Sequence, residues 1–168
     1  EMFVVLSECK KGNISLNDKV PLPPESWSVN LPQDASRMFL SEGENVTLKE
    51  LMLGLAIASG NDASIATAHY VAGTMQDFVN LMNEAVKEAG LTKTHFVESS
   101  GYSEENVTTA KEFARFARLY INTFPESLAL FHSQKKLAYP QEKNFSEKEK
   151  KESLSGKRIT IEQENTNK

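Results

Sequence analysis

The chain has 168 residues, of which 39% are hydrophobic, and a net charge of −4; this fits one domain, or one lobe of a larger domain, with a core that needs no metal or disulfide. Its lysines and arginines are scattered, so no basic stripe can neutralise phosphates, and we expect no nucleic-acid partner. The single cysteine, Cys9, excludes an internal disulfide and a thiolate cluster, and no apolar run approaches the roughly 18 residues that cross a membrane.

A helix and an extended segment are predicted in the first third of the chain. The apolar run Phe3–Leu6 begins the helix, which Gly12 ends after two lysines in its last turn. Three of the six prolines then lie in "VPLPPESW", which excludes a regular helix and favours an extended edge segment or a loop. Thr47 and Glu50 have capping-box spacing, which predicts the start of the next helix.

Two small, apolar helices are predicted on either side of a short polar break. The first, "LKELMLGLAIA" at 48–58, is apolar over most of its circumference and is expected to be central and buried. The second covers 63–72, with Asp62 as its predicted N-cap and Gly73 at its end. The break between them is Ser-Gly-Asn at 59–61. Hydrogen-bonding side chains between two buried segments indicate either a turn or a catalytic loop.

Three further helices are predicted after this break. One begins at Thr74 and ends at Gly90, and another begins at Thr109. The inward stripe of the first comprises Phe78, Leu81, Met82, Ala85, Val86 and Ala89. The stripe of the second comprises Phe113, Phe116, Ala117, Tyr120 and Ile121. Pro125 then fits the first turn of a short helix that ends near His132.

The chain changes character near residue 141. Residues 141–157 have mixed charge and almost no core-forming side chains, so we predict a charged surface insertion there. The alternation in "KRITIEQ", 157–163, predicts a strand, which is expected to pair with "KKLAY", 135–139, across the insertion. The predicted fold class is therefore mainly α, with little sheet.

Most candidate chemical groups in the sequence have an ordinary structural explanation. His69, His95 and His132 lack a second ligand at helical spacing, and no zinc signature or phosphate loop is present, so we expect no metal and no cofactor. "SECK" at 7–10 matches the S-x-x-K pattern of serine enzymes. That pattern needs a helix N-terminus, whose dipole assists the nucleophile, whereas this match lies in the last turns of its helix. We therefore reject Ser7 as a nucleophile.

The surroundings of the Ser-Gly-Asn triplet carry a more specific signal. They resemble the serine-type D-alanyl-D-alanine carboxypeptidases, the low-molecular-mass penicillin-binding proteins, through "LMLGLAIASGNDASIATAHYVAG", "FVNLMNEAVKEAGLTKTHFVESSGY" and "TAKEFARFA". The resemblance extends over residues 3–135 and resumes at "ITIEQENTNK". It implies that residues 1–168 are an incomplete DD-peptidase domain: the helical lobe of the β-lactamase/DD-peptidase (serine transpeptidase-like) fold, with most of the five-stranded sheet missing.

That family uses three motifs, S-x-x-K, S-x-N and K-T-G, and the resemblance implies that only the second is present, at 59–61. The first is expected before Glu1 and the third beyond Lys168, and "SGK" at 155–157 is no substitute because it lies in the charged insertion. In the family, the S-x-x-K serine attacks the penultimate D-alanine of a peptidoglycan stem peptide ending in D-Ala-D-Ala, and water hydrolyses the acyl-enzyme. β-Lactam antibiotics acylate the same serine. This chain is thus expected to be inactive alone.

The resemblance also implies roles for two residues of the triplet. Ser59 is expected to relay a proton between the lysine and the leaving amine, because a hydroxyl donates one proton while accepting another. Asn61 is expected to hold the lysine with one end of its amide and the substrate's peptide group with the other. The predicted catalytic residues are Ser59 and Asn61, with Asn61 also binding substrate. The parent protein is expected to be membrane-associated in the periplasmic or extracytoplasmic part of the bacterial cell envelope.

Two alternatives remain open from the sequence. A class A β-lactamase shares the fold and the mechanism, but it typically carries S-D-N and a separate glutamate for deacylation. Gly60 in the middle of the triplet and the lack of an E-x-x-L-N segment argue against that class. The second alternative is a non-catalytic helical binding module in which the triplet is a turn.

Overall fold

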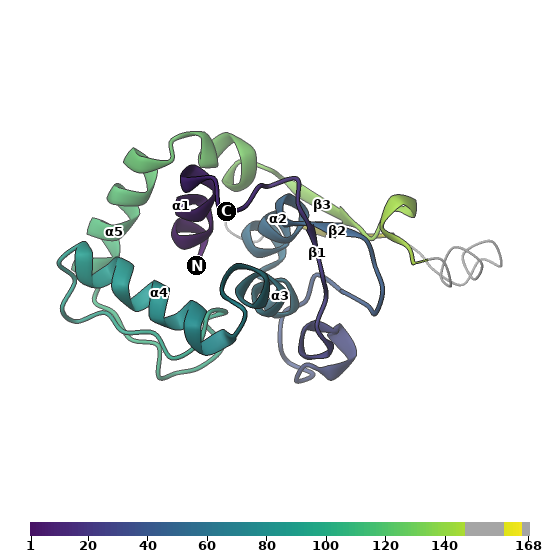
Figure 1. Cartoon of the computed structure of the whole chain (residues 1–168), viewed down its shortest axis with the longest axis horizontal. Coiled ribbons are helices and arrows are strands. Elements are labelled where there is room, and N and C mark those ends of the chain that lie inside the picture. Colours follow the sequence, from purple (N-terminus) through teal and green to yellow (C-terminus); the bar gives the residue numbers. More distant parts are fainter. Residues whose placement is uncertain (147–159, 166–168) are drawn as a thin grey trace.

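The computed structural model describes residues 1–146 and 160–165. In these ranges the chain forms five α-helices and two small antiparallel sheets. Figure 1 shows helices α4 and α5 at one end of the molecule, α2 and α3 in the middle, and the strands toward the other end. None of the described helices has the length and apolar character needed to span a membrane.

Helices α1 and α2 follow the predicted boundaries. Helix α1 covers Met2–Lys11 and ends at Gly12, whose left-handed backbone has φ 80°. Helix α2 covers Leu48–Ala58 and begins with the predicted capping box: the backbone N–H of Glu50 donates to the Thr47 hydroxyl (3.3 Å), and the N–H of Thr47 donates to the Glu50 carboxylate (2.9 Å). These reciprocal bonds satisfy two donors that a helix start leaves free.

Helix α2 is the centre of the hydrophobic core, as its apolar circumference predicts. Leu48, Leu51, Met52 and Ile57 are fully buried. The core around them also takes side chains from α1, α3, α4 and strand β3. Because α2 is fixed on several sides, its C-terminal end is a rigid support for whatever follows it.

Helices α3 and α4 pack beside this core. Helix α3 covers Asn61–Ala72, which is two residues earlier than predicted, and Gly60 is its N-cap. Helix α4 covers Met75–Glu88 and is capped by the Thr74 hydroxyl. Its buried residues are Phe78, Val79, Met82 and Val86. The predicted stripe is confirmed at Phe78, Met82 and Val86, and Val79 is an addition.

The predicted inward stripe of the next helix, α5 (Ala110–Thr123), is only partly correct. Phe113 is 64% exposed and Ile121 40% exposed. The helix instead approaches its neighbours along a narrower edge, where the Phe116 ring lies 5.1 Å from the ring of Phe3. The described residues therefore cover only part of the apolar stripe of α5.

The two sheets lie on the α2 side of the molecule (Figure 1). Strand β1 (Lys19–Val20) pairs antiparallel with β2 (Val46–Thr47). Strand β3 (Lys136–Tyr139) pairs antiparallel with β4 (Ile161–Glu164), which confirms the predicted pairing across the charged segment. The proline-rich segment forms the short 3₁₀ turns η1 (Pro24–Ser26) and η2 (Ser28–Asn30), and the predicted helix near His132 is a π-helical turn, η3 (Leu128–His132).

The segment that begins the expected charged insertion is packed where the structure describes it. Residues Glu142–Asn144 form a 3₁₀ turn, η4, and the exposed fractions of Asn144 and Phe145 are 1% and 5%. The Asn144 amide donates to the Asn45 carbonyl (2.8 Å) and to the Glu50 carboxylate (3.1 Å). Polar side chains are buried here because they meet backbone partners from a distant part of the chain. The remainder of the expected insertion, 147–157, lies outside the described residues.

Candidate active site

Ser59 stands at the end of α2 and is exposed. Its backbone is left-handed, with φ 50° and ψ 39°, a conformation that is uncommon for residues other than glycine. The backbone N–H groups of Ser59 and Gly60 both donate to the Gly54 carbonyl, which turns the chain sharply out of α2. Residues held in such conformations are concentrated at functional sites.

Gly60 is required here for space. Its φ is −67°, which any residue adopts, so the left-handed turn of the break falls on Ser59 instead. A Cβ atom at Gly60 would lie 2.8 Å from the Asp62 carboxylate and 3.0 Å from the backbone nitrogen of Met38. A glycine is therefore needed at this position because the backbone closely approaches a neighbouring segment.

Asn61 is the first residue of α3 and is partly exposed. Its backbone N–H donates to the Ser36 carbonyl (2.9 Å), and its side-chain Nδ2 donates to the same oxygen (3.1 Å). Among the described residues its Oδ1 atom has no hydrogen-bond partner. The Asn61 amide is thus anchored at one end and open at the other.

Asp62, the predicted N-cap, has a different role. It lies inside the first turn of α3, is fully buried, and accepts hydrogen bonds from the backbone N–H groups of Met38 (2.8 Å), Phe39 (2.8 Å) and Leu40 (3.0 Å). The Ser28 hydroxyl also donates to it (2.7 Å). The N-cap assignment is wrong because the carboxylate satisfies three consecutive donors of a segment more than 20 residues away.

Residues 28–40, which we call the Asp62-bound loop, form one side of the site. A second loop, residues 97–106, forms the other. The buried hydroxyls of Ser99 and Ser64 lie 2.6 Å apart, and Ser64 shares a helix face with Asn61 because it lies three residues further along α3. The exposed hydroxyl of Tyr102 donates to Asp34 (2.9 Å) and so joins the two loops. The sequence does not indicate that either loop belongs to the site, because no local sequence pattern predicts a contact between residues 68 positions apart.

Helix α1 starts beside the same turn of α3. The Glu1 carboxyl lies near Ser64 and Glu98, and burial raises the pKa of Glu1 to about 7. Glu1 also lines a hollow of about 410 Å³ together with Phe96, Ser99 and residues of α4 and α5. The N-terminal end of α1 and the Ser-Gly-Asn break are therefore brought to one region of the molecule.

An open groove of about 480 Å³ adjoins Ser59 on the side of strand β4. It is lined by Ala35, Ser36, Arg37, Phe39, Ala58, Gln163 and Glu164. Gln163 donates to the Arg37 carbonyl (2.8 Å), which fixes β4 against the Asp62-bound loop. The groove therefore lies next to the end of α2 that precedes the triplet.

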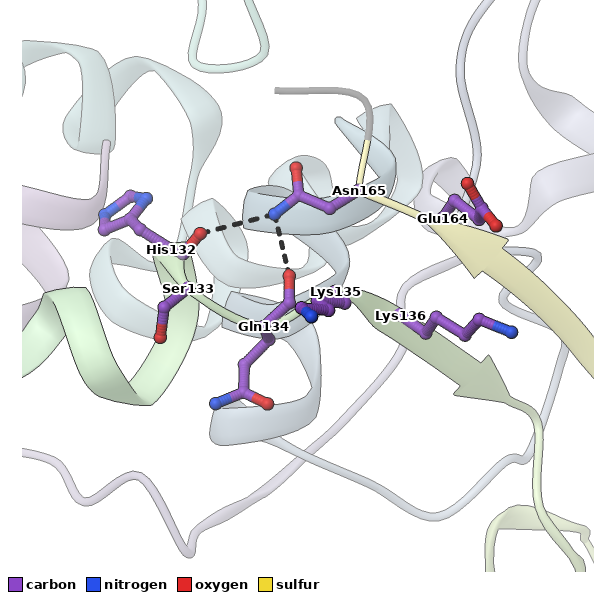
Figure 2. A pocket seen from close by; sticks show the side chains of 7 residues that line it. All are labelled: His132, Ser133, Gln134, Lys135, Lys136, Glu164 and Asn165. Atoms are coloured by element: carbon purple, nitrogen blue, oxygen red, sulfur yellow. Dashed lines mark hydrogen bonds between the residues drawn. The ribbon is translucent and has the colours of Figure 1, made fainter. Parts of the chain in front are cut away.

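A separate hollow of about 430 Å³ lies at the junction of η3 and the β3–β4 sheet, and Figure 2 shows the side chains that line it. It is lined by residues 132–136 with Glu164 and Asn165 and includes no residue of the triplet. The Asn165 amide donates to the carbonyls of His132 (3.3 Å) and Gln134 (2.8 Å), so this side chain joins the end of β4 to the turn that precedes β3.

The other chemical candidates make local contacts. The Ser7 hydroxyl donates to the Phe3 carbonyl within α1 (2.7 Å), and the Lys10 amine lies 5.9 Å from the ring centroid of Phe124. His132 is hydrogen-bonded to the Tyr120 hydroxyl (2.9 Å). In the described ranges no three His, Cys, Asp or Glu side chains come together as metal ligands would.

The sequence pattern of the D-alanyl-D-alanine carboxypeptidases matches residues 1–167. The chain belongs to this family. Among similar members, the D-alanyl-D-alanine carboxypeptidase DacF of Bacillus subtilis is 38% identical over 118 residues, which are 70% of this chain and 29% of that protein. DacC of Escherichia coli is 36% identical over 140 residues, 82% of this chain and 35% of that protein.

A solved structure of a penicillin-binding protein has the same fold. The crystal structure of penicillin binding protein 6B from Escherichia coli matches with a TM-score of 0.80 at 28% identity, over 99% of this chain and 48% of that chain. This confirms the predicted helical lobe of the DD-peptidase fold. The chain spans 29% and 35% of the length of the two relatives above, so it corresponds to one part of each of them.

Proposed function

We propose that this chain is the helical lobe of a serine D-alanyl-D-alanine carboxypeptidase that remodels peptidoglycan. Such an enzyme removes the terminal D-alanine of stem peptides and is acylated by β-lactams. The observation that supports this best is the break between α2 and α3, where Ser59 is exposed, Asn61 is open at Oδ1, and the start of α1 lies alongside. We call the enzyme that joins this chain to an S-x-x-K and a K-T-G motif the complete enzyme.

In the proposed reaction the S-x-x-K serine gives its proton to the lysine and attacks the carbonyl carbon of the penultimate D-alanine. The bond from that carbon to the nitrogen of the terminal D-alanine breaks, the amine takes up a proton and leaves, and water then hydrolyses the ester. Ser59 relays the proton from the lysine to the leaving amine. Its hydroxyl suits this role because it lies at the surface on a backbone turn that is fixed by α2.

Asn61 is proposed to position both the lysine and the substrate. Its Nδ2 already donates one proton to the Ser36 carbonyl, so the second Nδ2 proton remains for the carbonyl of the substrate's peptide group. Its Oδ1 atom is then the acceptor for the lysine ammonium. The anchor at Ser36 fixes the plane of the amide, which favours a single orientation of the two partners.

The substrate also determines the proposed location of the enzyme. Peptidoglycan stem peptides ending in D-Ala-D-Ala are found in the cell envelope, so we propose that the complete enzyme acts on the periplasmic or extracytoplasmic side and is associated with the membrane. Nucleic acid has no role in this function. The isolated chain, without the nucleophile, is proposed to be inactive.

Ser59→Ala and Asn61→Ala in the complete enzyme test the site assignment. Loss of the proton relay in Ser59→Ala should lower the rate of acylation by a labelled penicillin about 10²- to 10⁴-fold, the usual contribution of general acid–base catalysis. Asn61→Ala should slow acylation by misplacing both partners. Ser133→Ala and Asn122→Ala, which change the exposed residue that follows η3 and an exposed residue of α5, are matched controls.

The thermal midpoint of each variant separates catalysis from folding. If the triplet is only a turn, Ser59→Ala and Asn61→Ala should lose stability and keep the parental acylation rate. Near-parental acylation by both variants would overturn the assignment of Ser59 and Asn61. A lower rate at an unchanged thermal midpoint would support it.

A further inference from the structure

Hydrogen bonds connect the first turn of α3 to both loops that flank it, and the two loops to each other. The Ser36 carbonyl accepts from the backbone N–H and the Nδ2 of Asn61, which ties the Asp62-bound loop to α3. The hydroxyl pair Ser64–Ser99 ties the 97–106 loop to the same face of α3. The hydrogen bond from the Tyr102 hydroxyl to Asp34 links the two loops to each other.

The Tyr102–Asp34 bond differs from the other two links in its surroundings. Tyr102 is 51% exposed and Asp34 is also exposed, whereas Ser64 and Ser99 are buried. The bond joins a residue two positions before Ser36 to a residue three positions after Ser99. Its position lets it restrain one loop relative to the other.

Each loop has its own internal support that does not involve this bond. The Asp62 carboxylate holds the backbone of residues 38–40 and the Ser28 hydroxyl. The Glu98 carboxylate holds the 97–106 loop by accepting from the backbone N–H groups of Ser100 (2.6 Å), Gly101 (2.8 Å) and Ser103 (3.3 Å). Removing the Tyr102 hydroxyl therefore leaves both loops folded and releases only their relative position.

We propose that Tyr102 and Asp34 are positioning residues for acyl transfer. Their hydrogen bond holds the Ser36 carbonyl in place, and that carbonyl in turn orients the Asn61 amide. The inference rests on the proposed function, because it assigns Asn61 to the lysine and the substrate. A misplacement of about 1 Å at a reacting group lowers rates about 100-fold. Because water competes for this exposed bond, we expect a smaller loss, about 3- to 10-fold.

A double-mutant cycle in the complete enzyme tests this role. Tyr102→Phe and Asp34→Ala each remove one partner, and each should lower the penicillin acylation rate 3- to 10-fold. The double variant should be no slower than the slower single variant, since both remove one and the same bond. Asp34→Asn keeps an oxygen acceptor for the Tyr102 hydroxyl and should retain most of the parental rate.

Tyr70→Phe is the matched control. Tyr70 lies toward the other end of α3, and its hydroxyl donates to Asp18 (2.7 Å), so this variant also removes one tyrosine–aspartate bond. It should leave the acylation rate unchanged. For D-alanine release from a peptide ending in D-Ala-D-Ala, Tyr102→Phe should lower kcat/KM at an unchanged thermal midpoint.

Two outcomes would overturn the inference: a parental acylation rate in Tyr102→Phe, or fully additive losses in the double variant. Ser59→Ala in the same assay separates this failure from that of the proposed function. If Ser59→Ala is slow and Tyr102→Phe is not, only the positioning role fails. If Ser59→Ala and Asn61→Ala both react at the parental rate, the site assignment fails, and the positioning role fails with it.

Discussion

Ser59 adopts a left-handed backbone conformation that costs a residue with a side chain on the order of 1 kcal/mol, although a glycine stands next to it. The structure explains this order of residues. Gly60 is enclosed by Met38 and Asp62, where no Cβ fits, while Ser59 has open space on its outer side. The strained backbone conformation thus falls on Ser59, the residue of the break whose hydroxyl can reach the surface.

Gly60→Ala should destabilise the complete enzyme by about 1–3 kcal/mol, the usual effect of overpacking a tight site. The new methyl group would meet the Asp62 carboxylate and the backbone of Met38, neither of which can move without breaking their hydrogen bond. Urea denaturation measures the change. Ser59→Gly is the companion variant and should not lower stability, because glycine adopts the left-handed conformation freely. Equal stability of Gly60→Ala and the parent would contradict the account.

The sequence predicts the elements of this molecule where the signals are local, and it fails where they are distant. Thr47 and Glu50 cap their helix as their spacing indicates, and the alternating segment near Ile161 pairs as expected. Asp62 is different, because its partners lie 22 to 34 residues earlier in the chain and no short pattern announces them. The sequence around the Ser-Gly-Asn triplet marks it as a candidate site, whereas only the structure shows that the two loops lie beside it.

The 97–106 loop illustrates how one carboxylate can organise a segment with little regular structure. Burial alone would raise the pKa of Glu98, but hydrogen bonds from Ser100, Ser103 and Gly101 outweigh it, and the pKa is lowered from 4.5. A group whose pKa is lowered on folding stabilises the fold above its unfolded pKa. That contribution is lost as the pH falls through the folded pKa.

Acidification from pH 6 to pH 3 should therefore loosen this loop, because protonated Glu98 accepts its hydrogen bonds less strongly. Hydrogen-exchange protection factors at the Ser100 and Gly101 amides should fall over this interval. In Glu98→Gln the protection should already be lower at pH 6 and should change less with pH, and Glu105→Gln, at an exposed position of the same loop, should behave as the parent. Protection that is independent of pH in the parent would rule out this role of Glu98.

The family match covers nearly the whole chain, yet the chain covers about a third of the relatives' length. In the proposed function the described residues supply the Ser59 hydroxyl, the Asn61 amide and an adjoining groove, and the nucleophile and the K-T-G motif come from the remainder of the complete enzyme.

The isolated chain should form no covalent adduct with a labelled penicillin, whereas the complete enzyme should be labelled stoichiometrically. The Ser7 hydroxyl, which belongs to the S-x-x-K match at 7–10, is bonded to the Phe3 carbonyl inside α1. Intact-protein mass spectrometry after incubation with the antibiotic measures the adduct. Stoichiometric labelling of the isolated chain that disappears in Ser7→Ala would overturn both the rejection of Ser7 and the proposed inactivity.

Asn61 and Asp62 are adjacent residues that face opposite ways: the first meets the surface and the second is buried under the Asp62-bound loop. Because these two residues are adjacent, few positions near the break between α2 and α3 can accept an inserted residue. One codon inserted between Ser59 and Asp62 would turn α3 by about 100° relative to the preceding turn, so the amide or the carboxylate would lose its partners. Extra codons at Glu42 and Gly43, which are exposed and precede β2, leave both in register. Length variation in this lobe is therefore expected on the strand side of α2 rather than at the break that follows it.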